Sequence, residues 1–67
     1  MQPHRSDLID LTLALHMKTE RAILVSETGE EAKAVRLPLA QCEVAPLTRQ
    51  KVVVTLPEWL ALEKGLI

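Results

Sequence analysis

Residues 52–67 read VVVTLPEWLALEKGLI and describe a β-strand that leads directly into a short helix. The Val52-Val53-Val54 triplet has no polar residue at alternate positions, which indicates a strand covered on both faces. A strand over Lys51–Leu56 should therefore lie in the middle of a sheet. Something must cover its far side, and the helix that follows in the sequence is the nearest candidate.

The start and the end of this helix have sequence signals of their own. Thr55 and Glu58 have the spacing of a capping box, and Pro57 falls within the first turn, where a missing N–H costs nothing. Gly65 can adopt the left-handed conformation that ends many helices. The pattern predicts a C-terminal helix that packs three apolar side chains onto the sheet, namely Trp59, Leu60 and Leu62.

The segment Ile9–Met17 predicts the strand on which the rest of the fold depends. Its large apolar residues alternate with polar or small ones such as Asp10 and His16, a period of two that turns one apolar face inward. Wrapped as a helix, the same segment would scatter its polar residues among the leucines. The face predicted to be buried consists of Ile9, Leu11, Leu13, Leu15 and Met17.

The middle of the chain predicts shorter elements. Ala22–Ser26 is rich in β-branched residues and predicts a second strand, followed by a hairpin loop around Gly29. Glu31–Leu37 predicts a third antiparallel strand, whose charges and small side chains suit the edge of a sheet. Pro38–Gln41 predicts a single helical turn, and Gln41–Val44 a brief strand after it.

Together these elements predict an α+β, mostly β fold. We expect a four- or five-stranded antiparallel sheet, or a small SH3-like barrel, with one C-terminal helix. Residues 1–7 should form a flexible lead-in and residues 8–67 a single domain. The chain has one Trp and no Phe or Tyr, so the core must consist of Leu, Val, Ile and Ala. Pairing into a homodimer would bury more apolar surface than so small a domain can bury alone.

Charge and cysteine content limit the classes of partner and compartment. The formal net charge of −1 gives neither a general basic face for nucleic acid nor the acidic surface of a DNA mimic. The lone Cys42 excludes an intramolecular disulfide and favours a reducing compartment, so we expect a cytoplasmic protein. No apolar run approaches the ~18 residues of a membrane span, so no membrane association is expected.

Several stretches resemble a group of small phage and prophage proteins of unassigned role, in which a V-x-V-P-E-W-L-A-x-E-K-G-L ending recurs. The resemblance covers roughly two-thirds of the chain. The chain departs from the pattern of this group at Val35-Arg36, where a Trp is usual, and at Leu39-Ala40, where a Lys-Ser pair is usual. The resemblance implies a mobile-element origin and a small sheet-plus-helix fold, and it implies no catalytic residues. The matching stretches are Ala22–Val25, Gly29–Glu31, Leu37-Pro38 with Gln41, and Val54–Leu66.

Trp59 is the one aromatic residue and has two possible roles. As an interface anchor it could dominate the binding energy of a partner. In a core without other aromatic residues, it could instead pack the helix onto the sheet, with its N–H bonded to a carbonyl or to water. The sequence favours the second role and leaves the first open.

Four basic residues fall on neighbouring predicted strands and form a candidate strip, with Arg49 and Lys51 near the same rim. Contact with nucleic acid through this strip would be dominated by phosphates and weakened by salt. Interleaved acids such as Glu20 and Glu30 favour instead a mixed-charge face in contact with water. The candidate strip consists of Lys18, Arg21, Lys33 and Arg36.

The sequence offers no convincing catalytic or metal centre, and we expect neither enzyme activity nor a cofactor. His4 and His16 lie near Asp7 and Asp10, but no spacing brings three metal ligands together. His16 should instead lie on the solvated face of the first strand. Cys42 has the acidic neighbour Glu43, which disfavours the thiolate, so it should be a small buried hydrophobe. The polar loop tip contains Ser26, Thr28, Glu27, Glu30 and Glu31. It lacks the burial that would shift the pKa values of these carboxylates toward acid–base catalysis.

The leading expectation is a non-catalytic protein-interaction module of phage or prophage origin, which inhibits or modulates a host machinery. Its contact residues would be drawn from Lys18, Arg21, Lys33, Arg36 and Trp59. The alternative is a nucleic-acid-associated accessory protein that uses the basic strip, and a third possibility is a small virion component.

Overall fold

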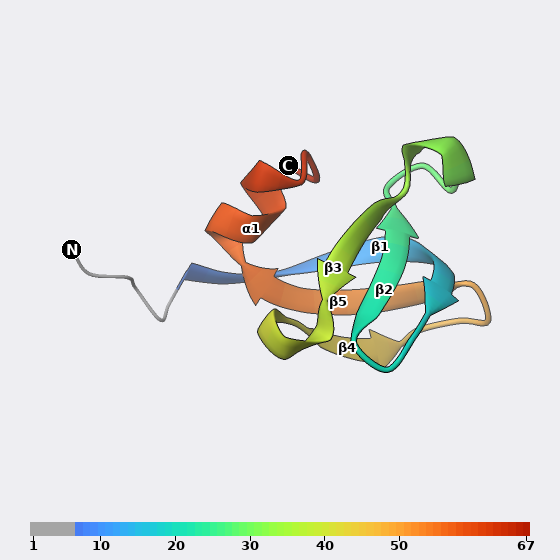
Figure 1. Cartoon of the computed structure of the whole chain (residues 1–67), viewed down its shortest axis with the longest axis horizontal. Coiled ribbons are helices and arrows are strands. Elements are labelled where there is room, and N and C mark those ends of the chain that lie inside the picture. The colour runs from blue at the N-terminus through green and yellow to red at the C-terminus, as the bar shows by residue number, and fades with distance from the viewer. Residues whose placement is uncertain (1–6) are drawn as a thin grey trace.

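The structure, a computed structural model, describes residues 7–67, so most of the expected lead-in over residues 1–7 lies outside the described part. Five strands form one antiparallel sheet in the order β3-β2-β1-β5-β4, and a single α-helix follows the last strand (Figure 1). The predicted α+β, mostly β fold, a four- or five-stranded antiparallel sheet with one C-terminal helix, is confirmed, and the number of strands is five. The elements are β1 Leu8–Lys18, β2 Ala22–Ser26, β3 Val35–Pro38, β4 Glu43–Pro46, β5 Lys51–Pro57, α1 Glu58–Glu63 and the 3₁₀ helices η2 Glu31–Lys33 and η3 Leu39–Gln41.

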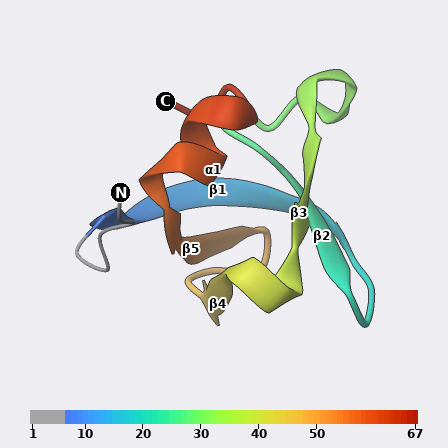
Figure 2. The ribbon, with the colours of Figure 1, turned by 60° about the vertical axis from the view of Figure 1, so that its left-hand side comes forward.

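Strand β1 is extended, as predicted, and it joins the two halves of the sheet. Its first part pairs with β5, from Leu8 opposite Pro57 to Ala14 opposite Lys51. Its second part pairs with β2. One half of the sheet therefore consists of β4, β5 and β1, the other half consists of β1, β2 and β3, and β1 belongs to both. The sheet curls about this strand, and η3 connects its two edge strands, β3 and β4 (Figure 2).

A β-bulge at His16 interrupts the alternation of β1. Leu15 pairs with Val25, but Met17 pairs with Leu24, so His16 is the extra residue in the ladder. A bulge shifts the side-chain phase by one position. Met17 is therefore 57% exposed, and the prediction that it lies on the buried face was wrong.

The core lies inside the curl and receives residues from both halves of the sheet and from the C-terminal segment. Val52, Val54 and Leu56 of β5 are buried, whereas Val53 between them is half-buried. Strand β5 therefore lies centrally, as predicted, but only one of its faces is fully covered. The buried cluster comprises Leu13, Ile23, Val25, Leu37, Val52, Val54, Leu56, Leu60, Ala61 and Leu66.

Helix α1 begins differently from the sequence prediction. Thr55 still belongs to β5, and its hydroxyl donates a hydrogen bond to Oδ1 of Asp10 on β1 (2.5 Å). Pro57 is the N-cap residue and has no side-chain capping bond, so the predicted capping box is wrong. The helix packs on the core through Leu60 and Ala61, not through Trp59 or Leu62.

The two edge strands are shorter than, or displaced from, the predicted ones. Glu31–Lys33, expected to begin the third strand, forms η2, and β3 begins at Val35. The predicted edge position of β3 is correct. Strand β4 occupies Glu43–Pro46 instead of Gln41–Val44, because an edge strand tolerates Pro46 where a central strand would lose a ladder hydrogen bond.

Gly65 ends α1 in the left-handed conformation that the sequence predicts, with φ of +74°. The N–H of Gly65 donates to the carbonyl of Leu62 (3.1 Å) and the N–H of Leu66 to that of Ala61 (2.8 Å), the pair of bonds of a Schellman motif. This turn brings Leu66 into the core.

Replacing Gly65 by alanine is expected to lower the free energy of unfolding by about 1 kcal/mol. An added Cβ would meet no atom within 4 Å, so the whole cost comes from the backbone conformation. Urea denaturation followed by circular dichroism measures the loss. Gly65→Asn should lose less, because Asn tolerates positive φ better than Ala. Equal stability of all three proteins would contradict the Schellman ending.

Candidate functional site

Helix α1 exposes two large apolar side chains. Trp59 is 53% exposed and Leu62 is 58% exposed, whereas Leu60 and Ala61 are buried. Residues three positions apart lie on the same side of a helix, so Trp59 and Leu62 form one surface, the Trp59–Leu62 face. The buried role that the sequence favours for Trp59 is wrong, and its role as an anchor stays open. Exposure of a chain's one aromatic side chain is informative, because Trp is highly buried on average.

The Trp59–Leu62 face has acidic surroundings on its own helix. Glu58 and Glu63 are exposed at the two ends of α1. Leu8, which is also exposed, pairs with Pro57 at the base of the helix. The surface around α1 therefore combines apolar side chains with carboxylates. An apolar centre with a polar rim is the typical arrangement of a protein interface.

The structure divides the four residues of the predicted basic strip. Lys18 ends β1 and Arg21 lies in the β1–β2 turn, where its carbonyl accepts the N–H of Leu39 (2.8 Å). Arg36 lies on β3 opposite Leu24. Lys33 lies in η2, beyond the other end of β2, where its Nζ is 3.6 Å from Oε1 of Glu30. Three of the residues thus belong to the hairpin end of the sheet, and Lys33 is separated from them.

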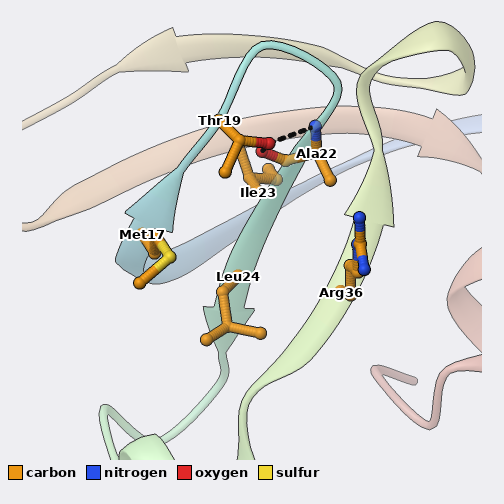
Figure 3. Close-up of a pocket in the computed structure, with 6 residues that line it drawn as sticks. All are labelled: Met17, Thr19, Ala22, Ile23, Leu24 and Arg36. Atoms are coloured by element: carbon orange, nitrogen blue, oxygen red, sulfur yellow. Dashed lines mark hydrogen bonds between the residues drawn. The ribbon is translucent and has the colours of Figure 1, made fainter.

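A shallow hollow of about 260 Å³ lies on the outer face of β1–β2–β3. Its central row crosses three strands, since Met17 pairs with Leu24 and Leu24 pairs with Arg36 (Figure 3). Sequence reasoning named Arg36 but missed the hollow, because it assigned Met17 to the core. The lining residues are Met17, Thr19, Ala22, Ile23, Leu24 and Arg36.

A polar network holds the loop after β2. Ser26 is 1% exposed, and its Oγ accepts the N–H of Gly29 (2.9 Å). Nε2 of His16 lies 2.8 Å from the same Oγ, so the bulge carries an imidazole onto a buried hydroxyl instead of into water. A Ser–His pair can activate a nucleophile. This one has no access to a substrate, because Ser26 is covered.

Cys42 is half-buried between η3 and β4 and packs against the core. Burial raises the pKa of the Cys42 thiol, which keeps it protonated and weakly nucleophilic. It lines an open hollow of about 450 Å³ together with Leu8, Glu43, Thr55 and residues of η3. The arrangement is that of a packing residue, not of a reactive cysteine.

Residues 7–67 contain neither a metal-binding cluster nor a membrane-spanning helix. No group of three or more His, Cys, Asp or Glu side chains is placed to hold a metal ion in this part of the chain, and His4 lies outside it. Over the same residues no helix has the length and apolar character needed to cross a membrane.

Comparison of the chain with protein-family models, with curated proteins and with solved structures finds no match.

Proposed function

We propose that this chain is a non-catalytic interaction module that binds a protein partner through the Trp59–Leu62 face. The observation that carries the proposal is the exposure of the chain's one aromatic side chain on a helix whose other side is fully packed. Trp is among the residues that most often dominate the energy of a protein interface. The carboxylates of Glu58 and Glu63 fit the rim of such a contact and favour a partner with basic groups beside an apolar pocket.

The resemblance to small phage and prophage proteins supports a mobile-element origin and directs the search toward a host or phage protein in the cytoplasm. Binding through an exposed apolar face suits an inhibitor or modulator of a host machinery, since such a protein needs no chemistry of its own. A homodimer through the same face is the competing outcome. Its interface would be isologous, with Trp59 of each copy against the other.

Photo-crosslinking tests which partner the face contacts. A benzophenone-bearing amino acid placed at position 59 should give one discrete cross-linked product in lysate of the host, and excess unlabelled protein should abolish it. The same amino acid at position 47 is the matched control, because Leu47 is 55% exposed but lies in the β4–β5 loop. Equal products from both positions, or none from position 59, would overturn the proposal. A product between two copies would identify the homodimer.

Replacing Trp59 by alanine is expected to weaken binding of the cross-linked partner at least tenfold, or about 1.4 kcal/mol. The stability of the domain should change by less than about 1 kcal/mol, because the side chain is more than half exposed. Isothermal titration calorimetry measures the affinity, and Leu47→Ala provides the control. Comparable losses in the two variants would show that general surface hydrophobicity, not Trp59, drives the contact.

A further inference from the structure

We propose that the hollow lined by Met17, Leu24 and Arg36 is a second binding site, which takes a large aliphatic side chain next to a carboxylate on an extended protein segment. The site lies on the outer face of β1–β2–β3, whereas α1 packs on the inner face through the core cluster. It is therefore separate from the Trp59–Leu62 face and does not depend on the function proposed for that face.

The walls of the hollow select an apolar group. Met17 and Leu24 occupy the row that crosses the strands, and Ala22 and Ile23 also line the hollow (Figure 3). Thr19 closes one end, but its hydroxyl is already engaged with Ala22, donating to the carbonyl and accepting the N–H (both 3.1 Å). The part of a ligand that enters the hollow thus meets carbon and sulfur atoms, and aliphatic groups gain most from that contact.

The size of the hollow indicates a side chain and not a cofactor. At about 260 Å³ it is below the ~300–1,000 Å³ range of pockets that enclose a small-molecule ligand. It is also open on the surface of a sheet, where a protein segment can pass over it. One large aliphatic side chain such as that of Leu or Ile fits these limits.

Arg36 supplies the charge that the neighbouring group must match. It is exposed, and it is the one charged residue among those that line the hollow. Within residues 7–67 the single ion pair joins Lys33 to Glu30, so no carboxylate of the described part neutralises Arg36. A planar guanidinium binds a carboxylate through two parallel hydrogen bonds. Lys18 and Arg21 add positive charge at the neighbouring β1–β2 hairpin, against the one acid Glu20, so charge complementarity favours an acidic segment.

The test uses three fluorescein-labelled ten-residue peptides on a Gly/Ser background. The first carries a central Leu flanked by two Asp, the second has Ala in place of the Leu, and the third has Asn in place of both Asp. Fluorescence anisotropy should show that the first peptide binds with a Kd of roughly 10–1,000 μM, a range typical of one anchored side chain with one ion pair. The other two should bind at least fivefold more weakly, and amide shifts in NMR spectra should centre on Met17, Leu24 and Arg36.

Substitutions in the protein distinguish binding at the hollow from general electrostatic attraction of an acidic peptide. Arg36→Gln should weaken binding of the first peptide about fivefold or more, because it removes the charged donor but keeps a polar side chain. Lys33→Gln removes the same charge away from the hollow and should leave the affinity unchanged. Trp59→Ala should also leave it unchanged, which distinguishes failure of this site from failure of the helix face. Absence of binding at millimolar peptide, equal effects of the two charge variants, or tighter binding of a twelve-nucleotide single strand would each overturn the proposal.

Discussion

Replacing Leu56 by alanine is expected to lower the free energy of unfolding by about 2–5 kcal/mol, the range for a leucine removed from a packed core. Leu56 is fully buried on the central strand β5 and belongs to the same cluster as Leu60 and Ala61 of α1. A domain of this size has a total stability of only about 3–10 kcal/mol. The substitution should therefore remove a large part of the total stability, and a domain at the lower end of this range would populate the unfolded state at room temperature.

The loss of stability in the Leu56→Ala variant should be largest at helix α1. Six residues are too few for a helix to be stable in water by itself, so α1 depends on packing against β5. A cavity at Leu56 removes part of that support, and α1 should fray in the variant before the sheet melts.

Urea denaturation followed by far-ultraviolet circular dichroism measures the effect. Fluorescence is a weak probe here, because Trp59 is more than half exposed in the folded state and changes environment little on unfolding. Leu62→Ala is the matched control: it deletes the same atoms from a position that is 58% exposed and should change the stability by no more than about 0.5 kcal/mol. Similar losses in both variants would contradict the assignment of Leu56 to the core and of Leu62 to the surface.

The positions of the inner strands β1, β2 and β5 could be predicted from the sequence because they follow from local patterns. Alternation placed the first strand at Ile9–Met17, and β1 is Leu8–Lys18; the segment predicted as the second strand coincides with β2. The glycine ending of α1 is likewise a local property of the chain. Each of these features is encoded within about ten consecutive residues, where propensity and periodicity act directly.

The features that the sequence did not predict depend on residues distant in the chain. Thr55 cannot cap α1 because its hydroxyl bonds to Asp10, 45 positions away on β1. The bulge at His16 is a property of the pairing between β1 and β2, and alternation within one strand contains no sign of it.

The candidate sites show the same division between local and distant information. Trp59 and Arg36 could be named as candidates, because an isolated aromatic residue and a charge within a strand are visible in the sequence. The side of the helix that Trp59 occupies could not be predicted, because α1 carries apolar side chains on two sides, with Trp59 and Leu62 on one and Leu60 and Ala61 on the other. Only the position of the core decides which pair is buried.

Replacing Ser26 by alanine is the second change with a large expected effect, a loss of about 1–3 kcal/mol, which is the cost of leaving a buried polar group without its partner. The Ser26 hydroxyl can donate to Nε2 of a neutral His16 imidazole while its oxygen accepts the N–H of Gly29, so all three groups are satisfied together. Alanine removes both bonds at a position that is 1% exposed, where water cannot replace them.

Thr28→Ala distinguishes this network from an ordinary turn contact. The Thr28 hydroxyl also accepts a backbone N–H, that of Glu30 (3.2 Å), but at an exposed position in the same loop. Water can take over that bond, so the control should change the stability by no more than about 0.5 kcal/mol. Thermal unfolding should then separate the two variants, because each kcal/mol shifts the Tm of so small a domain by about 4–8 °C. If Ser26→Ala were as mild as Thr28→Ala, the hydroxyl would have access to water, and the bulge at His16 would not serve to hold the loop after β2.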